Sequence, residues 1–282
     1  MNRFLLKQQL ADFFSEDIGY GDITSDAIFK DEQGEGVFVA KGPGVFSGEE
    51  IINAVKELYP ELGFTLFVRD GESFSAGKTL LKVKGPVTCI LSTERVILNL
   101  VQRLSGIAAM THEAVSRTAG TRVKISDTRK TTPGLRMLEK YAVRCGGGIN
   151  HRFGLDDAFL IKDNHIARAG SVTTAIKKAK QAGGHMVKIE VEVENTAQVK
   201  EAVAAEADVI MLDNCGPQQA ADWCKMIPSH ITVEISGGVT ISQIEAFTQT
   251  GADVISIGAL THSAGSVDIS LDILVKERTS YV

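Results

Sequence analysis

The chain has 282 residues, of which 44% are hydrophobic and 23% are charged, and its formal net charge is −5. This composition marks the protein as globular, with a sizeable core. It contains no run of about 18 apolar residues, which argues against a membrane span, and the N-terminal stretch lacks the apolar segment of a signal peptide. We therefore expect a cytoplasmic protein.

The four cysteines form no CxxC pair and have no histidine at metal-ligand spacing. A zinc site and a disulfide framework are therefore not indicated. We interpret all four as reduced, structural residues, because a free cysteine mostly behaves as a small buried hydrophobe. They are Cys89, Cys145, Cys215 and Cys224.

The first hundred residues or so predict a mixed α and β domain. Helices are expected at 4–15 and 49–58, and strands at 36–41, 64–70 and 79–85. Residues 92–108 follow a helical period, with one apolar side formed by Val96, Ile97, Leu100, Val101 and Leu104. We expect this last helix to connect two domains.

A basic, glycine-rich stretch runs from Asp127 to His165. Residues 121–168 hold ten Lys or Arg against five Asp or Glu, although the whole chain is acidic. Neither a core nor an ordinary solvated helix needs such a composition. A focused positive site on an acidic protein suits a small polyanionic ligand better than a nucleic acid. We expect the three glycines at 146–148 to serve backbone bends and assign them no phosphate.

From about residue 121 apolar strands alternate with helices. Strands are expected at 121–126, 158–162, 186–192, 208–213, 231–236 and 253–258, and helices at 171–182, 195–205, 217–226 and 241–250. Runs of Val and Ile without polar alternation are typical of strands buried on both faces. Strict alternation of strand and helix then predicts a parallel sheet.

Polar residues follow nearly every one of these strands. They are 127–130, 162–165, Glu192, Asp213 with Asn214, 236–238, and Gly258 with Ala259. In a closed α/β barrel all carboxyl ends of the strands face one mouth, whereas an open doubly wound sheet gathers them only near its switch point. Six strands are fewer than the usual eight, so we predict an incomplete α/β barrel of six or seven parallel strands.

An ordered set of motifs resembles the quinolinate phosphoribosyltransferase family. The residues that carry the resemblance are DTRKTTPGLRMLEKYAVRCGGGINHR, LIKDNH, IEVEVEN, IMLDN, EISGGV and ISIGALTHS, together with the earlier EDIGYGDITSD and ERVILNLVQRLSGIA. The match covers most of the chain in order, and the complete set is far more specific than any one piece.

The resemblance implies an N-terminal α/β sandwich domain, which we place at residues 1–108, and an α/β barrel at 109–269. The tail, 270–282, has no following helix and could return to the first domain. The family also implies a homodimer, in which one subunit's sandwich domain covers the partner's barrel mouth. The implied reaction transfers phosphoribose from phosphoribosyl pyrophosphate to quinolinate, releases pyrophosphate and CO2, gives nicotinate mononucleotide for NAD synthesis, and requires Mg²⁺.

Quinolinate carries two adjacent carboxylates, and guanidinium forks with ammonium charges hold such a planar dianion best. The resemblance assigns this binding to six residues, namely Arg95, which would reach in from the partner subunit, Thr128, Arg129, His151, Arg152 and Lys162. Lys130 would lie between the two substrates. For His165, a ligand contact and a structural hydrogen bond at a strand end are equally open.

Phosphoribosyl pyrophosphate needs carboxylates for its ribose hydroxyls and for Mg²⁺, because Mg²⁺ prefers oxygen ligands. The resemblance assigns this binding to Glu192 and Asp213, which would hold Mg²⁺ directly or through water, and assigns catalysis to these two acids with Lys130. Glu190, Glu192 and Glu194 share one face of their strand, so Glu190 stays an alternative to Glu192.

Backbone N–H groups are expected to bind the 5′-phosphate. Two successive late strand ends can supply them, at Ser236, Gly237 and Gly238 and at Gly258 and Ala259. A lone Gly-Gly pair is more often only a turn, but two such sites in succession favour phosphate binding.

Two other functions are compatible with the predicted fold. One is a paralogue that accepts another substrate, such as the pyrophosphorylase-like proteins encoded with molybdate transporters, and the other is a non-catalytic phosphate or nucleotide sensor. The paralogue would be expected to depart from DTRKTTPG or from the NHR-to-KDNH pattern, and the sensor to lack Lys130, Glu192 or Asp213. This sequence keeps all of these features, which favours the enzyme.

Overall fold

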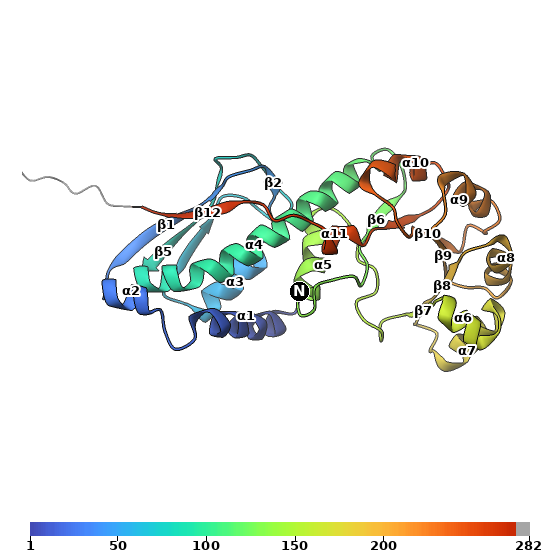
Figure 1. Ribbon diagram of the computed structural model, residues 1–282, viewed down its shortest axis with the longest axis horizontal. Helices are drawn as coiled ribbons and strands as arrows, with labels where there is room; N and C mark the ends of the chain where they lie inside the picture. Colours follow the sequence, from blue (N-terminus) through green and yellow to red (C-terminus); the bar gives the residue numbers. More distant parts are fainter. Residues whose placement is uncertain (275–282) are drawn as a thin grey trace, which may run out of the picture. The chain divides into compact units, whose positions relative to one another are not determined.

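The computed structural model describes residues 1–274, and Figure 1 shows its helices and strands. The chain divides into two compact units, one of Met1–Ala109 with the segment that begins at Ala264, and one of Met110–Ser263. Residues 275–282 of the expected C-terminal tail lie outside the described residues. None of the described helices is long and apolar enough to cross a membrane.

The first unit contains a four-stranded antiparallel sheet with the order β12-β1-β5-β3. Its strands are β1 (Gln33–Ala40), β3 (Gly63–Leu66), β5 (Thr79–Pro86) and β12 (Ile269–Ile273). Two short strands, β2 (Gly44–Val45) and β4 (Ser73–Phe74), form a separate pair. Ile269 lies opposite Ala40 and Ile273 opposite Gly36, so β12 returns from the end of the described chain to the N-terminal sheet.

The helices of this unit are α1 (Arg3–Ile18), α2 (Ile23–Ile28), α3 (Glu49–Leu58) and the part of α4 (Val87–Ser116) up to Ala109. The side chain of Asn2 accepts hydrogen bonds from the first N–H groups of α1, which buries Leu6, Leu10 and Phe14 at a helical spacing. Helix α2 was not predicted from the sequence. Asp22 precedes this helix, and its carboxylate accepts hydrogen bonds from the N–H groups of Thr24 and Ser25.

The second unit is built on six parallel strands with the order β6-β11-β10-β9-β8-β7. They are β6 (Lys124–Ser126), β7 (Phe159–Ile161), β8 (Ile189–Val193), β9 (Val209–Asp213), β10 (Thr232–Ser236) and β11 (Val254–Ser256). Strands β7 to β11 are neighbours in chain order, and the first strand, β6, pairs with the last, β11. An isolated parallel bridge between Ser126 and Ile149 adds one further pairing beside β6. This cyclic order confirms the predicted incomplete barrel.

Helices connect these strands, and Figure 1 shows α7, α8 and α9 on the outer side of the strands. The helical segments are α5 (Arg136–Cys145), α6 (Asp163–Ala169), α7 (Val172–Ala182), α8 (Thr196–Ala204), α9 (Pro217–Cys224), the 3₁₀ turn η1 (Ile241–Gln243), α10 (Ile244–Thr248) and α11 (Ala259–His262). The side chains of Ser171 and Asn195 cap α7 and α8. A proline opens α9, as is common at a first helical position.

The basic stretch contains a helix that the sequence analysis did not predict. Ten of its residues form α5, which buries Leu138, Tyr141 and Ala142. These residues recur at a spacing of three to four, which is a helical apolar stripe that the surrounding cations obscured. Of the three glycines that follow, Gly147 serves the expected bend, with φ of +89°. Gly148 instead allows close packing, because a Cβ there would lie 2.8 Å from Val143 Cγ1.

Candidate active site

Alternation along the parallel strands gathers the polar side chains of the second unit. Residues in register on neighbouring strands share a face, as do residues two apart on one strand. The registers place Glu192, Met211 and Glu234 side by side across β8, β9 and β10. Asp213 and Ser236 form the next row toward the carboxyl ends. One face of the sheet therefore carries a polar surface at the end where the strands stop.

This polar surface lines a cavity of about 480 Å³. The lining consists of Thr128, Arg129, Lys130, His151, Arg152, Leu160, Lys162, Glu192, Met211, Asp213, Asn214, Glu234, Ser236, Gly237 and Gly238. All the site residues predicted from the sequence are in this lining except Arg95, Gly258 and Ala259. The described structure therefore brings the predicted cations and acids of the second unit to one opening.

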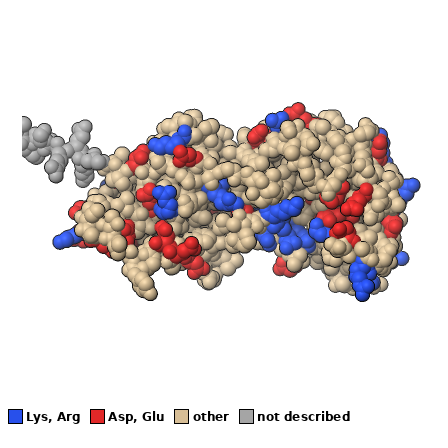
Figure 2. Space-filling view, viewed as in Figure 1, with Lys and Arg blue, Asp and Glu red and all other residues tan. Residues whose placement is uncertain are grey.

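The basic side of the cavity carries guanidinium groups with unused donors. Arg152 donates from Nη1 to the carbonyl oxygen of Ala158 at 2.8 Å, whereas the buried Nε atoms of Arg129 and Arg152 have no hydrogen-bond partner among residues 1–274. Burial, and then the positive charge of Arg129, lowers the pKa of Arg152. Both arginines line the cavity together with Lys130 and Lys162, and this concentration of positive charge favours an anionic ligand. On the face shown in Figure 2, one group of Lys and Arg side chains lies close to Asp and Glu side chains, and other Lys and Arg side chains are scattered.

Lys162 and Glu192 connect the basic and acidic sides of the cavity. The ammonium group of Lys162, just after β7, bonds to Oε1 of Glu192 in β8. The Lys162 side chain is 46% exposed and the Glu192 side chain 15%. Burial raises the pKa of Glu192, and the bond from Lys162 opposes that rise. On the acidic side, Asp213 accepts a hydrogen bond from the amide of Asn214 at 2.9 Å.

A buried ion pair supports the segment that carries His151 and Arg152. Lys140 of α5, 1% exposed, bonds to Asp127, 0% exposed. Asp127 also accepts the N–H of His151 at 2.9 Å, and Lys140 donates to the His151 carbonyl oxygen at 3.0 Å. Burial raises the pKa of Asp127, and the charge of Lys140 opposes that rise. Lys140 was counted among the charges available to an anionic ligand; its charge instead faces Asp127 and holds the backbone of the site.

His151 contacts two buried glutamates, of which Glu234 lines the cavity and Glu190 does not. Its Nδ1 accepts the N–H of Arg152 at 2.8 Å, so the ring hydrogen lies on Nε2, which is 3.0 Å from Glu190 and 3.5 Å from Glu234. The three groups lie within 4.8 Å of one another. Because Nε2 carries the hydrogen, it has no lone pair for a metal ion. Of the two glutamates left open by the sequence, Glu192 lines the cavity and Glu190 does not.

Glu234 lines the cavity and was not predicted from the sequence. The signal was available, because it is the one charged residue of the apolar strand ITVEIS and lies two residues before Ser236, on the same face. Asn214 was noted only as part of a strand end, and Leu160 and Met211 were read as ordinary apolar strand residues.

Glu234 should make the stability of the second unit depend on pH. Burial, and then the negative charge of Glu190, raises the pKa of Glu234 from 4.5 to about 7. Since the folded state holds this proton more tightly than the unfolded chain, the contribution is complete below about pH 4 and is lost as the pH rises toward 7. We expect Glu234→Gln, which keeps the shape of the protonated side chain, to gain stability relative to the unaltered protein between about pH 5 and 7.

The check is the urea midpoint of both proteins across that pH range. Glu245→Gln is the matched control, because Glu245 is 68% exposed and should leave the pH dependence unchanged. Parallel pH profiles for the unaltered protein and Glu234→Gln would contradict the expectation.

A tight turn after β10 forms one wall of the cavity. Gly237 and Gly238 have φ of +87° and +65°, and a Cβ at Gly237 would lie 2.4 Å from Oδ1 of Asn214. The N–H of Asn214 donates to the carbonyl oxygen of Ser236 at 3.0 Å. The missing side chain at Gly237 therefore lets the two strand-end loops pack against each other beside Asp213.

Three predicted site residues, Arg95, Gly258 and Ala259, lie outside the cavity lining, as does His165, whose role the sequence left open. Arg95 belongs to the first unit, where its side chain is 59% exposed and lies 3.8 Å from Glu94. Gly258 lies against the Lys130 side chain and Ala259 begins α11, so the structure does not bring this pair into the lining. His165 accepts the N–H of Lys162 at 2.9 Å through Nδ1, which is the structural hydrogen bond that the sequence left open.

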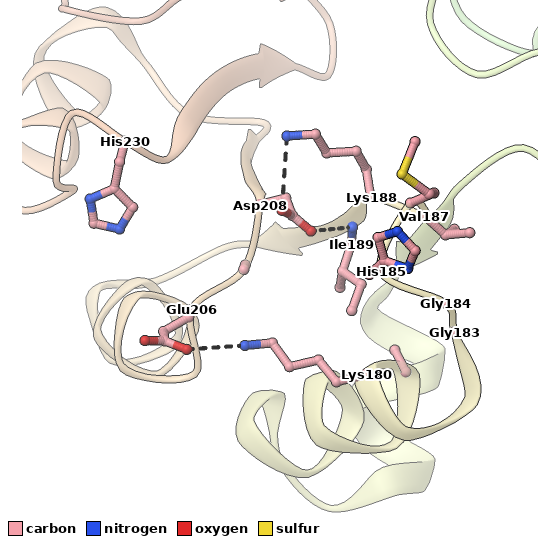
Figure 3. Close-up of a pocket in the computed structure, with 13 residues that line it drawn as sticks. Lys180, Gly183, Gly184, His185, Val187, Lys188, Ile189, Glu206, Asp208 and His230 are labelled. Atoms are coloured by element: carbon pink, nitrogen blue, oxygen red, sulfur yellow. Dashed lines mark hydrogen bonds and ion pairs between the residues drawn. The ribbon is translucent and has the colours of Figure 1, made fainter.

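A second cavity, of about 670 Å³, lies where β8, β9 and β10 begin. Figure 3 shows that its charged side chains face one another. Lys180 lies 3.3 Å from Glu206, and Lys188 lies 3.8 Å from Asp208, which also accepts the N–H of Ile189 at 2.8 Å. Both lysines in this lining are therefore paired with a carboxylate. Barrel enzymes hold their active sites at the carboxyl ends of the strands, which is the end opposite to this second cavity.

An incomplete α/β barrel with unpaired guanidinium donors and carboxylates at the carboxyl ends of its strands is the architecture of a barrel enzyme that binds anionic ligands. Residues 22–105 match the family described as quinolinate phosphoribosyl transferase, N-terminal domain, and residues 107–272 match the C-terminal domain of the same family. The chain belongs to the quinolinate phosphoribosyltransferase family, which confirms the prediction made from its motifs.

Similar proteins extend over almost the whole chain. A probable nicotinate-nucleotide pyrophosphorylase [carboxylating] from Bacillus subtilis is 52% identical over 280 residues, 99% of this chain and 97% of that protein. A nicotinate-nucleotide pyrophosphorylase [carboxylating] from Mycobacterium leprae is 40% identical and covers 92% of this chain and 93% of its own. The crystal structure of NadC from Streptococcus pyogenes superposes with a TM-score of 0.92 at 40% identity, covering 98% of this chain and 99% of that one.

Proposed function

We propose that this protein transfers phosphoribose from phosphoribosyl pyrophosphate to quinolinate and releases pyrophosphate and CO2, which makes nicotinate mononucleotide for NAD synthesis. Membership of the family and the names of the similar proteins support this reaction. The observation that carries it is the convergence of Arg129, Arg152 and Lys162 in the lining of one cavity. Guanidinium and ammonium groups gathered in this way suit a small dicarboxylate.

The basic side of the cavity would bind quinolinate. Arg129, Arg152 and Lys162 line it together with Thr128 and His151, and guanidinium forks suit adjacent carboxylates. His151 already uses both ring nitrogens in contacts to the protein, so its part would be to place Arg152 rather than to donate to the ligand.

The acidic side would bind phosphoribosyl pyrophosphate. Glu192 and Asp213 offer carboxylate oxygens to the same cavity, a donor set that fits Mg²⁺ and ribose hydroxyls. Bound there, Mg²⁺ would neutralise the charge of the pyrophosphate. The turn at Ser236, Gly237 and Gly238 would bind the 5′-phosphate through its N–H groups. Gly258 and Ala259, expected in the same role, lie outside the cavity lining, where Gly258 packs against the Lys130 side chain.

The reaction forms a bond between the pyridine nitrogen and C1 of the ribose and breaks the bond from C1 to pyrophosphate. Lys130, in the lining beside Arg129, would stabilise the charge on the departing pyrophosphate. When the neighbouring 2-carboxylate leaves as CO2, the electron pair of the broken bond stays on C2, where the adjacent cationic ring nitrogen stabilises it. A proton from solvent then binds to C2 and completes nicotinate mononucleotide. The arginines must hold the retained 3-carboxylate more firmly than the departing one, because equal stabilisation of both would oppose decarboxylation.

Three finer features belong to the same proposal. The exposed side chain of Arg95 would complete the site of a partner subunit in a homodimer. The protein would require Mg²⁺. It would act in the cytoplasm, in keeping with its four unbridged cysteines.

The decisive test is an assay with purified protein, quinolinate, phosphoribosyl pyrophosphate and Mg²⁺. We expect pyrophosphate and CO2 to appear in equal amounts and only when quinolinate is present. Pyrophosphate release that does not depend on quinolinate, or no turnover of either substrate, would refute the proposed reaction.

Gly237→Ala should weaken the use of phosphoribosyl pyrophosphate more than that of quinolinate. The new Cβ would clash with Asn214 and strain a left-handed residue, at about 1–3 kcal/mol of stability, and would displace the expected phosphate turn. The measurement is KM for each substrate. The control is Gly120→Ala, where φ is +77° but nothing lies within 4 Å, so both KM values should be unchanged. Equal rises in both KM values for Gly237→Ala would contradict the assignment.

A further inference from the structure

The ion pair between Lys162 and Glu192 joins side chains with different proposed ligands. Lys162 belongs to the side of the cavity that would take the dicarboxylate, and Glu192 to the side that would take phosphoribosyl pyrophosphate. Among residues 1–274, Lys162 is also the one Lys or Arg of this lining that forms an ion pair, since Arg129, Lys130 and Arg152 make none there. A protein carboxylate thus bonds to the lysine that a substrate carboxylate would need.

This pair stands in the way of both ligands. While Glu192 bonds to Lys162, the ammonium group faces a carboxylate that is only 15% exposed, and one oxygen of Glu192 is engaged. A dicarboxylate that binds Lys162 competes with Glu192 for the charge of the ammonium group. A ribose hydroxyl or cation that binds the engaged oxygen of Glu192 likewise competes with Lys162.

We propose that exchange of the Lys162–Glu192 pair couples the two substrate sites, so that binding of either substrate frees the residue that the other one needs. This inference rests on the proposed function. The first ligand bears the cost of breaking the pair, and the second binds to a side chain that is already free. Because coupling of binding sites is reciprocal, each substrate should raise the affinity for the other by the same factor, here roughly 5- to 20-fold.

The opposite role for Glu192 gives the opposite sign. If Glu192 served to hold Lys162 in position for the dicarboxylate, neutralising it would weaken dicarboxylate binding. If the Lys162–Glu192 pair exchanges as proposed, neutralising Glu192 strengthens dicarboxylate binding, because no carboxylate then competes for Lys162. The sign of the change in affinity therefore separates the two roles without any measurement of turnover.

The test is calorimetric titration with phthalate, which has the two adjacent carboxylates but no ring nitrogen to react. We expect Glu192→Gln to bind phthalate roughly 5- to 20-fold more tightly than the unaltered protein when no other ligand is present. Asp213→Asn is the matched control, because it removes a carboxylate from the same cavity whose bonded partner is Asn214 instead of a lysine. Its phthalate affinity should change by less than about twofold.

Two further titrations complete the experiment. Phosphoribosyl pyrophosphate with Mg²⁺ should tighten phthalate binding in the unaltered protein but not in Glu192→Gln, and Glu192→Gln should lose its effect in a Lys162→Met background. Unchanged or weaker phthalate binding in Glu192→Gln, or an equal gain in Asp213→Asn, would overturn the exchange while leaving the proposed reaction intact. No phthalate or quinolinate binding by the unaltered protein would overturn both.

Discussion

Replacement of Asp127 by alanine should lower the free energy of unfolding by about 3–5 kcal/mol and remove most of the activity. Asp127 and Lys140 are 0% and 1% exposed, so the variant leaves a buried ammonium group without its counter-charge. It also removes the acceptor for the N–H of His151 and for the amide of Asn150. The backbone from which Arg152 projects would therefore lose its support.

The two effects can be separated by a second variant. Asp127→Leu combined with Lys140→Met replaces the pair by apolar side chains, and such replacements are often close to neutral for stability. We expect the double variant to recover most of the denaturation midpoint but little activity, because the hydrogen bonds to His151 stay absent. Asp222→Ala is the control, since its pair with Lys225 is exposed and its loss should leave the midpoint nearly unchanged. An Asp127→Ala midpoint equal to that of Asp222→Ala would refute the structural role.

The parallel strands and their polar ends could be predicted because the signals are local. An apolar run such as IMLD predicts a buried strand from its own residues, and the polar residue at its end, Asp213, is adjacent in the chain. Barrel topology then converts separate strand ends into one opening without any knowledge of side-chain contacts. That is why cations and acids as distant as Arg129 and Asp213 could be assigned to one site.

The remaining features depend on contacts between distant residues, which composition does not encode. Nothing local distinguishes Lys140, bonded to Asp127 on another element, from Lys130, which lines the cavity. Both are basic residues in one stretch, and only their positions on α5 and on a strand end separate them. Gly258 and Ala259 are an example of the opposite kind. Their local sequence resembles a phosphate-binding turn, but Gly258 packs against the Lys130 side chain and neither residue lines the cavity.

Arg152→Ala should weaken quinolinate binding by about 1.5–3 kcal/mol, roughly 10- to 150-fold, and leave phosphoribosyl pyrophosphate binding nearly intact. The bond from Nη1 to the carbonyl of Ala158 orients the guanidinium group in the lining of the cavity. Truncation removes the positive charge and the donors of this group. It also exposes an incoming dianion to Glu190 and Glu192, whose charges now act on Arg152.

Separate calorimetric titrations with quinolinate and with phosphoribosyl pyrophosphate measure the effect. Arg168→Ala is the control, because Arg168 is an exposed residue of α6 outside the cavity lining and should change neither affinity. Arg152→Lys sharpens the test, since it keeps the charge but lacks the planar fork and should restore only part of the loss. Full recovery by lysine would mean that charge alone matters at this position. Loss of phosphoribosyl pyrophosphate binding with quinolinate binding retained would instead place Arg152 on the other side of the cavity.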